Sequence, residues 1–149
     1  MKKIVILGST GSIGTQALDV VARHPDRFEV VGLAAGKNVD LVAEQIAKFR
    51  PKRVSVEGAA EAAGLRKRFP KNGPEILEGW EGPCALVREL DADLVISAIV
   101  GAAGLRPTMA AIDLGKAVAL ANKESLVIAG ELITRKAREK KVPLIPIDS

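Results

Sequence analysis

A glycine-rich loop near the amino terminus most constrains what this chain can fold into. Residues 4–14 read Ile-Val-Ile-Leu-Gly-Ser-Thr-Gly-Ser-Ile-Gly, and residues 15–21 follow with the spacing of an amphipathic helix. The apolar run from Ile4 to Leu7 is too short for a helix and suits a buried strand of a parallel sheet. A strand, a glycine loop and a helix in this order predict a dinucleotide-binding α/β fold.

Three glycines in this loop lie three residues apart, and each position has a physical reason for glycine. We expect Gly8 to allow a tight exit from the strand, Gly11 to let a diphosphate approach the backbone, and Gly14 to let helix and strand pack closely. Free N–H groups in the first turn of the helix would attract the phosphates. Three hydroxyl side chains add donors to the loop: Ser9, Thr10 and Ser12. An ordinary strand-to-helix turn is the alternative interpretation.

Apolar strands alternate with helical patterns along the rest of the chain. The predicted strands cover residues 4–7, 28–35, 53–56, 75–77, 93–98, 116–120 and 143–147. The predicted helices cover residues 15–21, 39–49, 59–69, 105–114 and 124–140. This alternation predicts a doubly wound parallel sheet, a Rossmann-type dinucleotide-binding domain, over residues 1–149. Residues 78–83 are rich in turn formers, so we expect a surface connection there.

Composition narrows the class of partner. Hydrophobic residues make up 48% of the 149 residues but aromatic residues only 3%, so we expect an aliphatic core. The formal net charge is +4, yet no block of Lys and Arg alternates with aromatic residues, which argues against a nucleic-acid partner. A small polyanionic ligand explains the excess positive charge equally well.

Cysteine content and hydropathy indicate a compartment. The single cysteine, Cys84, allows no internal disulfide, as is usual in a reducing cytoplasm. The first apolar run is too short for a signal peptide, and no stretch approaches the roughly 20 residues of a membrane helix. We therefore expect a cytoplasmic chain without a membrane partner. Cys84 stands in a surface connection near the start of a short helix and is expected to be an ordinary thiol, and Trp80 is expected to pack rather than to recognise a ligand.

The end of the second predicted strand bears on which nucleotide binds. An NAD-specific domain usually places an acid there to accept from the ribose hydroxyls. Here the nearest acid, Glu29, opens the strand, and its end is followed by Gly36, Lys37 and Asn38. Gly36 leaves room, Lys37 supplies charge and Asn38 a donor, which favours the 2′-phosphate of NADP. In the alternative interpretation, Asn38 simply caps the helix that begins at residue 39.

Two more polar clusters follow predicted strands at their carboxyl ends. Asn122, Lys123 and Glu124 come after the strand that ends at residue 120, and Asp148 and Ser149 come after the last strand. In open α/β sheets, ligands bind outside the carboxyl ends of the strands. Asn122 and Glu124 also suit an ordinary helix start, whereas a lysine in a first turn opposes the helix dipole unless it faces an anion. Both interpretations stay open on the residues alone.

Four segments of the chain resemble the 1-deoxy-D-xylulose 5-phosphate reductoisomerase family: residues 8–14, 34–39, 119–125 and 146–149. The Ala-Asn-Lys-Glu block at residues 121–124 and the Ile-Asp-Ser end are more specific than the glycine loop, and the resemblance extends from Lys3 to Ser149. Family members are considerably longer than this chain. The resemblance implies that this part binds NADPH, while further chain supplies the rest of the catalytic site, a closing loop and a helical domain.

The resemblance also implies a role for each matching residue. The pyrophosphate of NADPH would lie against the glycine loop, at Gly8, Thr10, Gly11, Ser12 and Ile13. The phosphate on the adenosine would lie against Gly36, Lys37 and Asn38. Cofactor and substrate would meet near the reacting carbons at Asn122 and at the catalytic residues Lys123 and Glu124.

The implied reaction requires a metal and a phosphorylated sugar as substrate. Asp148 would be one ligand of Mg²⁺ or Mn²⁺, and Ser149 would contact the substrate. The metal would act as a Lewis acid in the rearrangement of 1-deoxy-D-xylulose 5-phosphate to 2-C-methyl-D-erythritol 4-phosphate, an isoprenoid precursor, and NADPH would supply the hydride. The further acidic ligands of the family would follow Ser149 and are absent from this sequence, although a hard cation needs several oxygen ligands. A homodimer is implied for the full-length protein, and no turnover is expected from this chain alone.

Two other functions remain as alternatives. An NADP domain of a semialdehyde dehydrogenase has a similar loop but needs a catalytic cysteine, and Cys84 is poorly placed for that role. A redox-sensing module that binds NADP would give no reason for Lys123, Glu124 and Asp148 to meet at one edge. A self-contained short-chain dehydrogenase needs a Tyr-x-x-x-Lys pair, and the chain has no tyrosine.

Overall fold

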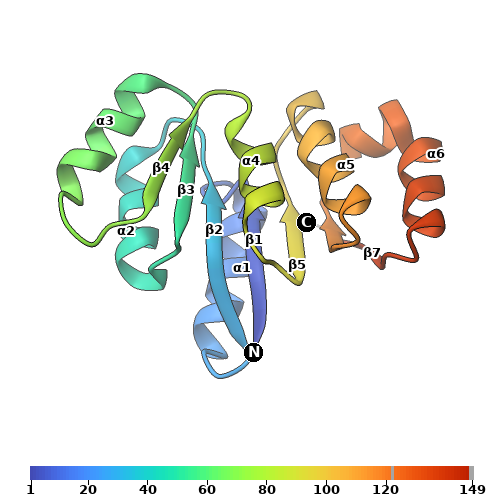
Figure 1. The fold of residues 1–149 in the computed structure, drawn as a ribbon, viewed down its shortest axis with the longest axis horizontal. Coiled ribbons are helices and arrows are strands. Elements are labelled where there is room, and N and C mark those ends of the chain that lie inside the picture. Colours follow the sequence, from blue (N-terminus) through green and yellow to red (C-terminus); the bar gives the residue numbers. More distant parts are fainter. Residues whose placement is uncertain (122, 148–149) are drawn as a thin grey trace.

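The chain folds around one parallel sheet (Figure 1). The computed structural model describes residues 1–121 and 123–147, with the backbone alone over residues 123–129. Within these residues, seven strands pair in the order β4-β3-β2-β1-β5-β6-β7. The strands are β1 (Lys2–Leu7), β2 (Phe28–Ala34), β3 (Arg53–Val56), β4 (Glu75–Glu78), β5 (Leu94–Ser97), β6 (Ala117–Leu120) and β7 (Leu144–Pro146).

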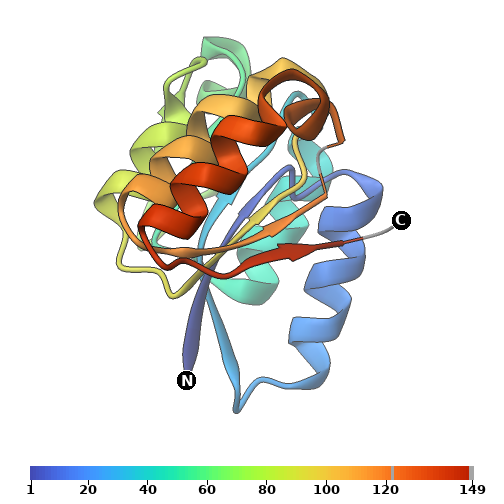
Figure 2. The same ribbon diagram turned by 90° about the vertical axis from the view of Figure 1, so that its right-hand side faces the viewer.

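Helices connect the successive strands, which is why all the strands can run parallel. They are α1 (Ser12–Arg23), α2 (Val39–Phe49), α3 (Ala59–Arg68), α4 (Gly82–Glu89), the short 3₁₀ helix η1 (Ala102–Gly104), α5 (Leu105–Asp113) and α6 (Lys123–Glu139). Figure 2 shows α4, α5 and α6 stacked on one side of the sheet and α1 and α2 on the other. The predicted doubly wound parallel sheet is confirmed.

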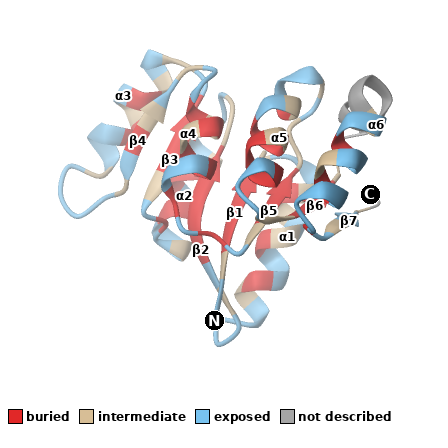
Figure 3. Cartoon of the chain, turned by 45° about the vertical axis from the view of Figure 1, so that its right-hand side comes forward, coloured by how far each residue is buried: buried red, intermediate tan, exposed pale blue. Residues whose placement is uncertain are grey.

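Two aliphatic cores fill the space between the sheet and its helices. On β1, Ile4 and Ile6 join the core under α1, α2 and α3, whereas Val5 and Leu7 join the core under α4, α5 and α6. Strand β1 is therefore buried on both faces from Ile4 to Leu7, which explains the unbroken apolar sequence of these four residues. Figure 3 shows the buried residues along the strands and on the inner sides of the helices.

One register row crosses the sheet and defines the edge where the site lies. Neighbouring Cα partners along this row are Ser55, Ala34, Leu7, Ser97, Leu120 and Pro146. The loops after β1, β2, β3, β5 and β6 therefore leave the sheet at the same carboxyl edge. The sheet grows in opposite directions on either side of β1 and β5, so the switch point of the topology lies between these two strands.

The main difference from the sequence prediction is the burial of α4 at its start. The prediction put Cys84 near the start of a short helix, which is confirmed, but it also put this residue in a surface connection, which is wrong. Helix α4 begins at Gly82, with Pro83 in its first turn, and buries Cys84. Its buried residues Leu86 and Val87 belong to the core that also contains residues of α5 and α6.

Candidate functional site

The glycine loop between β1 and α1 has two glycines that the fold itself requires. Gly8 has φ +87°, and a Cβ there would lie 2.5 Å from the carbonyl oxygen of Ala98. A Cβ on Gly14 would lie 2.1 Å from the carbonyl oxygen of Gly8. Both distances are impossible for real atoms, so the tight exit and the close packing expected of these two glycines are confirmed.

Gly11 differs from its two neighbours in this loop. A Cβ there would meet only the carbonyl oxygen of Gly8, at an ordinary 3.6 Å, and its φ of −80° suits any residue. Nothing in the described part of the chain therefore requires glycine at this position. The space that the missing side chain leaves opens into a cleft, where a ligand can approach the backbone.

The amino terminus of α1 points its first-turn N–H groups at the same loop. Gly11 is the N-cap residue, no side chain caps the helix, and its first turn carries no acidic residue. The hydroxyl of Thr15 donates to the carbonyl oxygens of Gly11 and Ser12 and so does not cap the helix N–H groups. An uncapped helix start backed by the helix dipole suits an anionic ligand.

A cleft of about 790 Å³ lies at this edge of the sheet. It is lined by residues of the loops after β1, β2, β3, β4 and β5 and by the start of α5. The predicted site residues that line it are Gly8, Thr10, Gly11 and Gly36. Ser12 is exposed at the start of α1, whereas Ile13 lines a separate apolar groove beside β5.

The three residues after β2 that the sequence analysis assigned to the cofactor differ in their surroundings. Gly36 lines the cleft, and Lys37 and Asn38 are exposed next to it. The side-chain oxygen of Asn38 accepts a hydrogen bond of 3.2 Å from the backbone N–H of Leu41, so Asn38 caps α2. The capping alternative for Asn38 is thus confirmed, and only its NH₂ group is left to donate to a ligand.

The sequence analysis missed an acid in the cleft, Glu57, which comes from the end of β3 rather than β2. Its carboxylate oxygen would lie 3.5 Å from a Cβ on Gly36, and its backbone N–H donates to the carbonyl oxygen of Gly36 at 3.2 Å. A carboxylate here opposes a 2′-phosphate, while Lys37 and Arg106 offer positive charge around the same space. The pairing of β3 with β2 brings Glu57 to this position.

The expectation that Trp80 packs is wrong. Trp80 lies in the turn between β4 and α4, is 69% exposed and lines the cleft. The guanidinium carbon of Arg106, on α5, lies 4.6 Å from the centroid of its ring.

A second residue that the sequence analysis missed supports the glycine loop from behind. The buried side-chain amide of Gln45, on α2, donates to the carbonyl oxygen of Ser9 at 2.9 Å. Ser9 is itself fully buried and does not line the cleft, so the expectation that its hydroxyl faces a ligand is wrong. Within the described residues, this hydroxyl and the side-chain oxygen of Gln45 have no hydrogen-bond partner.

Cys84 is unsuited to be a nucleophile. Its side chain is buried in α4 and forms no disulfide. Burial raises the pKa of the thiol, although the nearby guanidinium groups of Arg88 and Arg106 lower it in part. Because the thiolate is the reactive form, a buried thiol with a raised pKa is inert at neutral pH.

Several predicted site residues lie outside what the structure describes. Asn122, Asp148 and Ser149 are not among the described residues. Lys123 and Glu124 lie in the first turn of α6, directly after β6, and their side chains are not described. In the described part of the chain, no three His, Cys, Asp or Glu side chains come close enough to hold a metal ion. None of the helices searched there is both long and apolar enough to span a membrane.

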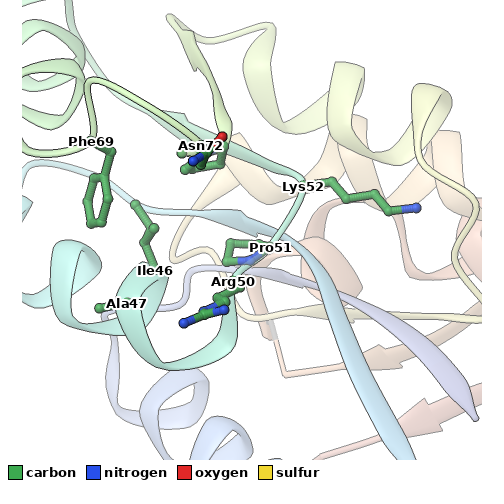
Figure 4. A pocket seen from close by; sticks show the side chains of 9 residues that line it. Ile46, Ala47, Arg50, Pro51, Lys52, Phe69 and Asn72 are labelled. Carbon is green, nitrogen blue, oxygen red and sulfur yellow. The ribbon is translucent and has the colours of Figure 1, made fainter.

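A further pocket, of about 530 Å³, lies at the opposite edge of the sheet, where α2 ends and β3 and β4 begin (Figure 4). Arg50 and Lys52 lie at this pocket, but Figure 4 shows the Lys52 side chain extending away from Phe69 and Ile46. The pocket has no helix amino terminus, and the negative end of the α2 dipole lies beside it. It therefore lacks the features that suit a dinucleotide.

Comparisons with known proteins agree with this geometry. Residues 4–130 match the family model described as 1-deoxy-D-xylulose 5-phosphate reductoisomerase. A curated protein of that description from Anaeromyxobacter sp. (strain K) is 57% identical over 149 residues, which is 100% of this chain and 38% of the relative. The chain thus spans less than two fifths of that relative's length.

Two solved structures have the same fold. The reductoisomerase from Zymomonas mobilis in complex with NADPH superposes with a TM-score of 0.93 at 38% identity, covering 99% of this chain and 39% of that one. A crystal structure of DOX-P reductoisomerase in complex with magnesium gives a TM-score of 0.93 at 36% identity and covers 100% of this chain and 38% of that one.

Proposed function

Since the chain belongs to the 1-deoxy-D-xylulose 5-phosphate reductoisomerase family, we propose that residues 1–149 form its NADPH-binding domain. One observation carries this proposal: Gly11 leaves an open approach to the backbone at the uncapped start of α1. A side chain at this position would obstruct a diphosphate, and no other atom of the described chain uses the space. The relative from Zymomonas mobilis, solved with NADPH, supports the same ligand.

Different residues around the cleft would contact different parts of the dinucleotide. Thr10, Gly11, Ser12 and Ile13 would present backbone N–H groups and hydroxyls to the pyrophosphate. Lys37 and the NH₂ group of Asn38 would contact the 2′-phosphate beside Gly36. When bound, NADPH supplies a hydride, and its nicotinamide would lie toward β5 and β6, on the far side of the switch point.

We further propose that the whole protein is an NADP-dependent reductoisomerase that converts 1-deoxy-D-xylulose 5-phosphate to 2-C-methyl-D-erythritol 4-phosphate. Lys123 and Glu124 support this because they begin α6 at the same carboxyl edge as the cleft. Asn122, the metal ligand Asp148 and the substrate contact Ser149 are carried over from the family resemblance. A phosphorylated sugar as substrate, Mg²⁺ or Mn²⁺ as metal, a homodimer and a cytoplasmic location belong to the same proposal.

Calorimetric titration of this chain with NADPH and with NADH tests the proposed cofactor. We expect saturable binding of NADPH and weaker binding of NADH, because only NADPH carries the 2′-phosphate whose charge Lys37 would neutralise. Absence of NADPH binding to the folded chain contradicts the proposed function. Equal affinities contradict the 2′-phosphate assignment alone.

A further inference from the structure

Trp80 is the only tryptophan of the chain, and it is exposed inside the cleft rather than packed in the core. Gly11, Gly36 and Glu57 line the same cleft. Because Trp80 is 69% exposed and lines the cleft, most of its indole surface is available to a ligand with an apolar face.

The turn that carries Trp80 is held on both sides. Gly79, with φ +90°, donates its N–H to the carbonyl oxygens of Val56 and Glu57, both at 3.2 Å. The N–H of Gly82 donates to the carbonyl oxygen of Gly79 at 3.1 Å, and a Cβ on Gly82 would lie 1.9 Å from the Ser55 hydroxyl oxygen. The left-handed conformation of Gly79 and the tight packing of Gly82 thus fix the turn against the end of β3. The backbone of Trp80 is therefore held at the wall of the cleft.

Arg106 completes this wall of the cleft. It lies in the first turn of α5, next to the buried Pro107, and its guanidinium carbon is 4.6 Å from the centroid of the Trp80 ring. At this distance a guanidinium group is attracted to the ring's electron-rich face. Since α4 and α5 pack side by side, the two side chains reach each other from neighbouring helix starts.

We propose that Trp80 and Arg106 form the platform on which the adenine ring of the dinucleotide stacks. This inference rests on the proposed function and assigns a part of the site that the glycine loop and Lys37 do not cover. Trp80 and Arg106 line the same cleft as Gly36, which follows β2, the strand whose end contacts the adenosine ribose in dinucleotide-binding folds. Purine rings stack on aromatic side chains and on guanidinium planes, and such stacking needs no matched hydrogen bonds.

Fluorescence of Trp80 tests the contact directly because no other tryptophan contributes to the signal. Adenosine 2′,5′-bisphosphate, which lacks nicotinamide, should quench Trp80 emission saturably, whereas reduced nicotinamide mononucleotide should produce no saturable quenching. A saturable quench by the adenosine fragment that disappears in Gly11→Val would place adenine and pyrophosphate in the same cleft. If calorimetry detects binding of the adenosine fragment but Trp80 emission is not quenched, the proposed platform is wrong.

Substitutions then separate the platform from the rest of the site. Trp80→Leu should weaken the binding of adenosine 2′,5′-bisphosphate and of NADPH by the same factor, about 5- to 100-fold, because each ligand loses the stacking of one base. Trp80→Phe should keep most of the affinity, and Arg106→Leu should lose less than Trp80→Leu. Circular dichroism should be unchanged, since Trp80 is exposed.

Two outcomes distinguish the inference from the proposed function. If the wild-type chain binds NADPH and folded Trp80→Leu binds it with the same affinity, the proposed platform is wrong but the proposed function stands. No NADPH binding to the wild-type chain overturns both. If Trp80→Leu does not fold, the quench of wild-type Trp80 by the adenosine fragment still decides.

Discussion

The side-chain amide of Gln45 donates to the carbonyl oxygen of Ser9 across 2.9 Å in the buried space between α2 and the glycine loop. The two residues are 36 positions apart in the chain, so this contact joins α2 to the glycine loop that follows β1. Backbone bonds from Gly8 and Ser9 to the carbonyl oxygen of Ala34 hold the loop against β2 as well. The loop is therefore positioned before any ligand arrives.

Gln45→Leu should weaken NADPH binding and also lower the free energy of unfolding by about 1–3 kcal/mol, because it leaves the buried Ser9 carbonyl without this donor. Gln16→Leu is a matched control, since Gln16 is an exposed glutamine on α1 outside the cleft. Calorimetry and chemical denaturation measure the two effects. Unchanged NADPH affinity in folded Gln45→Leu would show that the loop does not depend on this bond.

Gly11→Val should abolish NADPH binding and leave the fold intact. Its Cβ meets no atom closer than 3.6 Å, so the folded chain can accept a side chain that a diphosphate cannot. Gly14→Val is the contrasting variant, because a Cβ there would lie 2.1 Å from the Gly8 carbonyl oxygen and should prevent folding. Circular dichroism and NADPH fluorescence measure folding and binding separately. Normal binding by folded Gly11→Val would reduce the loop to an ordinary turn.

Lys37→Ala should weaken the binding of NADPH about 10- to 100-fold and change the binding of NADH little, because charge-assisted hydrogen bonds contribute about 1.5–3 kcal/mol. Glu57→Gln should act in the opposite direction and strengthen NADPH, since it removes a negative charge beside Gly36. Titration calorimetry with both nucleotides measures each change. An equal loss of NADH and NADPH affinity in Lys37→Ala contradicts its contact with the 2′-phosphate.

The alternation of strands and helices could be read from the sequence because each element has its own local periodicity. The bounds and burial of α4 could not, since Gly82 and Pro83 are typical of turns and the helix spans only eight residues. Glu57 and Gln45 were missed for a different reason. Their contacts depend on which strands pair and which helix covers the loop, and neither relationship is a property of adjacent residues.

The glycine loop shows the same limit within one motif. Spacing predicted the roles of Gly8 and Gly14, because backbone close packing follows from the strand-loop-helix order. The direction of the Ser9 side chain was not predictable, because α2 covers the loop on that side and buries it. Trp80 was predicted to pack only because a lone aromatic in a turn usually does, whereas here the turn is fixed by backbone hydrogen bonds.

The thiol of Cys84 should react slowly with thiol reagents at pH 8 in the folded chain and rapidly in urea. Burial raises its pKa, so folding favours the protonated thiol. The resulting stability is fully present below the unfolded pKa, about 8.5, and is lost as the pH rises through the folded pKa. Unfolding free energy should therefore fall more steeply above pH 8.5 in the wild-type chain than in Cys84→Ala. Complete labelling of the folded protein within the mixing time contradicts the buried position.

The last prediction concerns turnover: this chain alone should bind NADPH without oxidising it. The described residues contain no cluster that could hold a metal, and catalysis by a metal needs it fixed against the substrate in a site closed to water. With 1-deoxy-D-xylulose 5-phosphate, NADPH and Mg²⁺, the rate of NADPH oxidation should equal the background.

A chimera provides the matched positive control. This chain should restore turnover when it replaces the matching 38% of the Anaeromyxobacter relative, because the two are 57% identical over that part. Asp148→Asn in the chimera should lose most of the activity while NADPH binding persists, since a neutral amide is a weaker ligand for a hard cation. Turnover by the chain alone, or full activity of the Asp148→Asn chimera, contradicts the metal role of Asp148.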